Sequence, residues 1–98
     1  MNFFDMINLL VSNASNISNI DTNECPVTNK MIYNIHFYDY HILTLIFEKH
    51  INSYALLGYL LALKNAQRNR YLSAEEMNIR STIYMFFNYN ELIYFNLN

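Results

Sequence analysis

Apolar positions along this chain change their spacing several times, and each spacing predicts a different element. Between residues 31 and 38 the side chains of Met31, Tyr33, Ile35 and Phe37 alternate with other residues. A spacing of two places them on one side of an extended segment. The pattern therefore predicts a β-strand over 31–37.

The next segment, 39–51, begins with an aspartate and carries Ile42, Leu45 and Ile46 at helical spacing. This spacing predicts a helix with one apolar side. Asn52 then provides a break and a cap for a second helix. Two helices joined this tightly are expected to pack against each other.

The second helix is predicted over 54–68, and its first half is apolar on every side. Residues 55–62 contain no charge, whereas the following residues carry cations but no acid. Because an all-apolar helix has to be covered on every side, we expect a central core helix with part of one face in contact with a partner. Gly58, the only glycine, suggests a close approach of another helix to this one.

The C-terminal segment is predicted to form a helix over 74–87 and a strand over 92–96. The capping-box pattern Ser-x-x-Glu at 73–76 marks the start of this helix. An alternative is that residues 82–87 form a strand paired with 92–96, because β-branched and aromatic residues suit a hairpin.

The domain prediction divides the chain into three parts. Residues 1–11 form an N-terminal docking helix, since Phe3, Ile7 and Leu10 share one helical side. Residues 12–30, rich in Ser, Asn, Asp and Thr, form a polar linker. Residues 31–98 form a compact domain. The predicted fold class is mainly α: a small single-domain helical bundle with short strands at 31–37 and 92–96.

Composition adds an expectation about the surface. The chain has 98 residues, of which 53% are hydrophobic and 14% charged, against roughly 25% charged residues in ordinary domains. This deficit predicts an uncharged surface patch, which most often marks protein–protein contact or self-association. The candidate interface residues are Tyr54, Leu57, Tyr59, Leu61, Tyr84, Phe87 and Tyr89.

A second hypothesis is nucleic-acid binding, although the net charge of −2 argues against a general polyanion binder. The segments S-A-E-E-M, N-I-R-S-T-I-Y and L-I-Y-F-N-L resemble the short helix, the start of the recognition helix and the wing strand of a winged helix–turn–helix. Roughly a full helical turn or more of the usual motif is missing between Met77 and Asn78. The resemblance implies that Arg80, Ser81, Thr82 and Tyr84 face DNA. It also implies that the preceding cations, Lys64, Arg68 and Arg70, contact phosphate.

Catalytic and cofactor chemistry find little support in the sequence. A single glycine excludes the glycine-rich loops that bind nucleotides. His36, His41 and His50 lie at no standard metal-ligand spacing, and Glu24 beside Cys25 is expected to raise the pKa of that thiol. We therefore expect no enzyme, no metal and no cofactor.

The remaining features concern context. One cysteine requires no oxidising compartment, the N-terminus lacks a positive region, and no apolar run is long enough to span a membrane. An intracellular, cytoplasmic protein is expected. Abundant Asn, Ile, Tyr and Phe favour an AT-rich gene, typical of viral or mobile-element accessory proteins. The leading hypothesis is a non-enzymatic interaction module, a homo-oligomer that sequesters a partner.

Overall fold

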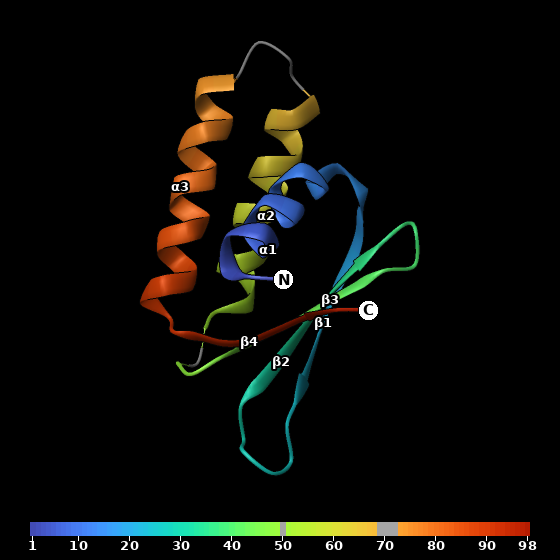
Figure 1. Cartoon of the computed structure of the whole chain (residues 1–98), viewed down its shortest axis with the longest axis vertical. Coiled ribbons are helices and arrows are strands. Elements are labelled where there is room, and N and C mark those ends of the chain that lie inside the picture. Colours follow the sequence, from blue (N-terminus) through green and yellow to red (C-terminus); the bar gives the residue numbers. More distant parts are fainter. Residues whose placement is uncertain (50, 69–72) are drawn as a thin grey trace.

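The computed structural model describes residues 1–49, 51–68 and 73–98, apart from the side chains of residues 53, 67, 68 and 73–76. Over these ranges the chain forms three α-helices, a short 3-10 turn and four strands (Figure 1). In chain order they are α1 (Phe3–Ser12), η1 (Ala14–Asn16), β1 (Ile17–Glu24), β2 (Met31–Phe37), β3 (Ile42–Phe47), α2 (Ser53–Arg68), α3 (Ser73–Tyr89) and β4 (Leu92–Leu97).

The strands form one antiparallel sheet in the order β1-β2-β3-β4. Each of the first three strands pairs with the next one along the chain. After α2 and α3, the chain returns to the sheet, and β4 pairs with β3 so that Leu43 lies opposite Leu97 and Ile46 opposite Tyr94. Along the sequence, the two long helices therefore lie between two strands that are neighbours in the sheet.

The prediction of a mainly α helical bundle is wrong, because the segment 39–51 contributes β3 rather than a helix. In β3, Leu43, Leu45 and Phe47 are buried, and the residues between them are half-buried. Nearly every residue from 42 to 47 is apolar, so a helical spacing and a spacing of two are both present. Periodicity alone does not separate strand from helix in such a run, and the strand is selected by pairing on both of its sides.

A tight turn before β3 also escapes the sequence pattern. The Phe37 N–H donates to the His41 carbonyl at 3.0 Å, and the Tyr40 N–H donates to the Phe37 carbonyl at 3.1 Å. Tyr40 has a φ of 72°, in the left-handed region that glycine adopts more easily than tyrosine. Because no glycine or Asn-Gly pair marks this hairpin, its local sequence does not predict a turn.

The segment 12–30, predicted as a polar linker, supplies η1 and β1. Strand β1 pairs with β2 over its length, with Thr22 opposite Tyr33. Ile17 is its one buried residue, and most of its other side chains are exposed. Since β1 is an edge strand held mainly by backbone hydrogen bonds, it tolerates a polar composition that otherwise indicates a loop.

Other sequence predictions are confirmed. The strand expected over 31–37 is β2, the helix over 54–68 is α2, and 74–87 and 92–96 lie within α3 and β4. The cap expected at Asn52 is present, since its side chain accepts from the Tyr54 N–H at 2.8 Å. At the start of α1, the Asn2 side chain accepts from the Asp5 N–H at the same distance of 2.8 Å. The predicted capping box at 73–76 lies outside the described side chains.

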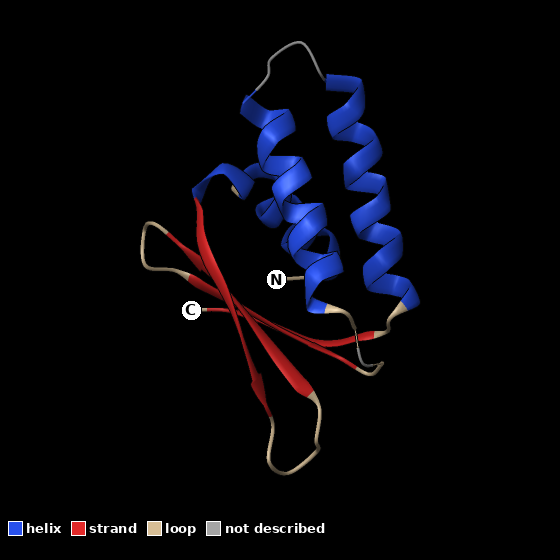
Figure 2. Cartoon of the chain, turned by 180° about the vertical axis from the view of Figure 1, so that it is seen from behind, coloured by secondary structure: helices blue, strands red, loops and turns tan. Residues whose placement is uncertain are grey.

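All three helices gather on one side of the sheet, and the β1–β2 connection projects away from them (Figure 2). The core lies between the two layers and contains Tyr33 from β2, Leu45 from β3 and Phe87 from α3. The hydroxyl of Tyr33 donates to the Ile51 carbonyl at 2.9 Å, which satisfies its polar atom inside the core. The opposite side of the sheet carries a polar row in which Asn34 donates to Asp21 at 3.0 Å and Thr44 donates to Asn34 at 2.9 Å.

Gly58 does not serve the close helix packing that its sequence position suggested. It lies on the exposed side of α2, and a β-carbon placed there would meet no atom within 4 Å. The glycine therefore weakens the helix without any packing benefit within the described chain.

We predict that Gly58→Ala raises the free energy of unfolding by about 0.5–1 kcal/mol, because alanine loses less backbone entropy on forming a helix. Urea denaturation followed by circular dichroism, at concentrations where the protein is monomeric, measures this change. Ala62→Gly, one turn later on the same exposed side, should lower it by a similar amount. A Gly58→Ala variant less stable than the wild type would contradict the open space around Gly58.

Candidate interaction surface

The exposed side of α2 carries an unbroken apolar surface. Tyr54, Leu57 and Leu61 are 82%, 39% and 49% exposed, and Gly58 and Ala62 lie beside them on the same exposed side. Their spacing of three and four places all five residues along one line of the helix. We call this set the α2 face. It contains no charged residue.

The opposite side of α2 explains why the helix is apolar all round. Leu56, Leu60 and Leu63 are almost completely buried against the core. The α2 face points the other way, so no part of the described chain covers its leucines and tyrosine fully. An uncovered apolar surface of this kind is typical of a contact site.

The apolar surface continues from α2 onto the start of β1. A small cavity of about 90 Å³ is lined by Leu57, Leu61, Ile17 and Ile20 among others. At its edge, the Lys64 ammonium donates to the Ile17 carbonyl at 3.0 Å. The surface is thus wider than a single helix side, and the cation at its rim already has a partner.

The other predicted interface residues are placed differently. Phe87 is completely buried, with its ring 5.3 Å from that of Phe47, so it belongs to the core. Tyr59 is half-buried against Phe86. Tyr89 is exposed at the end of α3 beneath the Lys49 ammonium. Tyr84 is half-buried and contacts the rings of Phe3 and Phe4.

The residues predicted for nucleic acid do not form one basic surface among the described side chains. Lys64 lies at the β1 side of α2, whereas Arg80 donates to the Asn8 side chain at 3.3 Å from α3. Thr82 donates to the Asn78 carbonyl within α3. The Arg68 side chain and residue 70 lie outside the described part of the chain.

The helix–turn–helix geometry is also absent from the described residues. Helix α3 is continuous from Ser73 to Tyr89. No turn separates Met77 from Asn78, so the predicted short helix and recognition helix are one element. The sequence lacks the residues that would separate two helices at this point, so one helix continues through it.

A second apolar surface lies between α1 and α3. A groove of about 630 Å³ is lined by Phe4, Ile7, Asn8, Arg80, Ser81, Tyr84 and Met85. We call it the α1–α3 groove. One wall of the groove includes Arg80, Ser81 and Tyr84, which the sequence pattern had singled out. The other wall comes from α1, which neither the protein-contact hypothesis nor the DNA hypothesis included. The sequence pattern did indicate one residue of this surface: Phe4 is a large apolar residue that does not share the core-facing side of α1, and it is exposed.

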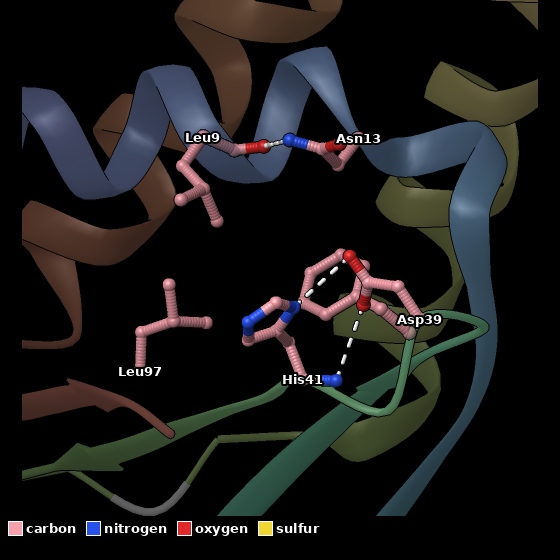
Figure 3. A pocket seen from close by; sticks show the side chains of 6 residues that line it. Leu9, Asn13, Asp39, His41 and Leu97 are labelled. Atoms are coloured by element: carbon pink, nitrogen blue, oxygen red, sulfur yellow. Dashed lines mark hydrogen bonds and ion pairs between the residues drawn. The ribbon is translucent and has the colours of Figure 1, made fainter.

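The most acid–base-like arrangement lies in a smaller pocket of about 170 Å³ (Figure 3). The Asp39 carboxylate lies 3.0 Å from Nδ1 of His41 and accepts the His41 backbone N–H at 3.1 Å. The second ring nitrogen of His41 faces the space between Leu9 and Leu97 (Figure 3). Such a pair could orient a general base, but the described lining residues include no serine, threonine or cysteine to act as its nucleophile.

The remaining candidates for metal or thiol chemistry are isolated. The described residues contain no group of three or more His, Cys, Asp or Glu side chains that could hold a metal ion. His36 pairs with Asp21 at 2.7 Å on the open side of the sheet. Hydrogen bonds from Thr28 lower the pKa of the Cys25 thiol, contrary to the rise expected from its neighbouring glutamate.

Within the described residues, none of the helices is both long enough and apolar enough to traverse a lipid bilayer. Comparison of the chain with protein-family models, curated proteins and solved structures found no match.

We predict that the Asp39 carboxyl titrates below its ordinary pKa of 3.8, because the His41 side chain and backbone both donate to its charged form. Carbon-13 NMR of the side-chain carboxyls measures this pKa. His41→Ala should return the pKa of Asp39 toward 3.8, while the pKa of Asp21, lowered by Asn34 and His36, stays unchanged as the internal control.

The lowered pKa of Asp39 also makes the stability of the fold depend on pH. Because folding lowers the pKa of Asp39, its contribution is present above pH 3.8 and is lost as the pH falls through the folded-state value. An Asp39 pKa that His41→Ala leaves untouched would show that the pair is not formed in solution.

Proposed function

We propose that this chain is a non-enzymatic protein–protein interaction module and that the α2 face is its contact surface. The observation that carries the proposal is a line of exposed, uncharged apolar residues about two turns long, on a helix whose other side is already buried in the core. Covering Leu57 and Leu61 removes apolar area from water, which is the main favourable term in protein association.

The shape of the α2 face favours a helix as the opposing element. Gly58 and Ala62 have the smallest side chains of the α2 face and lie beside the larger Leu57 and Leu61. Side chains of a facing helix fit over such small residues, which brings the two helix axes close together. Because the α2 face carries no charge, the α2 faces of two copies of the chain can meet without like-charge repulsion. A second copy of the chain, with its α2 antiparallel, is therefore the partner that this proposal names.

The size of the surface sets the expected strength. From Tyr54 to Leu61 the α2 face extends over about 11 Å of helix, at about 1.5 Å per residue. The neighbouring surface at β1 adds area, but the total is small beside a standard interface of about 1,600 Å². We therefore expect a reversible dimer that dissociates in the micromolar range.

The proposal predicts that Leu61→Glu gives a monomer at concentrations where the wild type is dimeric, because the change places a charge in an apolar contact. Sedimentation velocity or light scattering over a concentration series measures the mass. Met77→Glu is the matched control: Met77 is also an exposed apolar side chain, at 69%, but lies on α3 outside the α2 face.

Thermal unfolding checks that both variants are folded at the concentrations used. A wild-type chain that remains monomeric at high micromolar concentration would refute self-association through the α2 face. Equal loss of dimer in the Leu61→Glu and Met77→Glu variants would assign the contact to another surface.

A further inference from the structure

The α1–α3 groove has a definite polarity along its length. At one point of the groove, the ring of Phe4 on α1 contacts the ring of Tyr84 on α3. One turn further along α1, Asn8 accepts from Arg80, which lies one turn before Tyr84 on α3. The two helices therefore run in opposite directions along the groove. One end is therefore apolar, with Phe4, Tyr84 and Met85, and the other end is polar.

The apolar end is open to solvent. Phe4 and Met85 are 64% and 68% exposed, although their neighbours Ile7 and Tyr84 are buried and half-buried. The exposed phenylalanine and methionine flank the groove rather than fill it. Aromatic rings and flexible methionine side chains are frequent in surfaces that receive apolar groups of a partner.

Among the described lining residues, Arg80 gives the polar end one positive charge. The guanidinium of Arg80 donates to the neutral amide oxygen of Asn8 at 3.3 Å, and the described lining residues include no acid. A guanidinium has five N–H donors, so this one long bond to the described side chains leaves capacity for a carboxylate in a two-pronged contact. Ser81 adds a hydroxyl at the same end.

From these observations we propose that the α1–α3 groove binds an amphipathic helix of a partner protein that carries an acidic residue one turn from a large apolar residue. Arg80 and Tyr84 are four residues apart, which is about 6 Å along α3. A helix lying in the groove matches this separation with residues at i and i+4. The carboxylate contacts Arg80, and the apolar side chain lies among Phe4, Tyr84 and Met85.

This second surface does not depend on self-association through the α2 face. The two surfaces share no lining residue: one uses α2 and β1, the other α1 and α3. Loss of dimerisation and loss of helix binding are therefore separate outcomes, measured on separate variants.

The test uses fluorescence anisotropy with a labelled peptide of about 16 residues, long enough to populate a helix, in which leucine and glutamate are spaced four apart. A matched peptide replaces each glutamate with glutamine. We expect the acidic peptide to bind the full chain, and the glutamine peptide to bind about three- to tenfold more weakly, because it lacks the charge that pairs with Arg80.

Three protein variants locate the site. Arg80→Gln should weaken the acidic peptide by about the same three- to tenfold and leave the glutamine peptide unaffected. Met85→Glu should weaken both peptides. Met77→Glu, on the same helix and equally exposed, should weaken neither beyond a small effect of net charge.

Several results would overturn the proposal. They are no binding of the acidic peptide at high micromolar concentration, equal binding of the two peptides, or equal effects of Met77→Glu and Met85→Glu. If Arg80→Gln instead abolished binding to vesicles of anionic lipid, with no effect on the peptide, the groove would recognise a lipid headgroup and the proposal of a partner helix would fail.

Discussion

The pairing of β4 with β3 is the constraint on which the rest of this fold depends. It joins the end of α3 to the strand that precedes α2, and the connection is reinforced where the Glu48 N–H donates to the Glu91 carbonyl at 2.8 Å. Beside it, the ring of Phe47 lies 5.3 Å from that of Phe87. Because both ends of the α2–α3 pair are fixed to the same two strands, the helices have to lie on the sheet.

This fixed position decides which sides of the helices face solvent. With Leu60 and Leu63 directed into the core, the residues on the other side of α2 have no layer left to cover them. Over the described residues the helices lie on one side of one sheet (Figure 2), so α2 directs one side to the core and the other side away from it. The exposed α2 face is therefore a consequence of this topology.

The parts of the fold that sequence reasoning predicted are those with a local cause. Strand β2 has a clear spacing of two, and α2 has a capping asparagine at Asn52. The errors concern elements whose cause is distant. Strand β3 is selected by its neighbours on both sides, and β1 is held by backbone hydrogen bonds to β2 despite its polar sequence. Neither influence is visible in the local pattern of residues.

The same distinction applies to the candidate site. Tyr54, Leu57 and Leu61 were identifiable because an apolar helix without charge is a local signal. Phe87 has the same chemistry as a surface anchor, yet its position at the end of α3 beside Phe47 makes it a core residue. Composition gives the number of aromatic residues, whereas the topology of the fold decides which of them face the core and which face solvent.

The α1–α3 groove lay beyond sequence reasoning for a further reason. Its walls are 72 residues apart at the Asn8–Arg80 contact, and no spacing within either helix predicts that they meet. The sequence pattern assigns Arg80 and Ser81 to DNA, and Tyr84 to both DNA and a protein interface. The structure places the three on one wall of one groove, where a single cation beside an apolar surface suits a carboxylate with an apolar neighbour better than a row of phosphates, which calls for several cations.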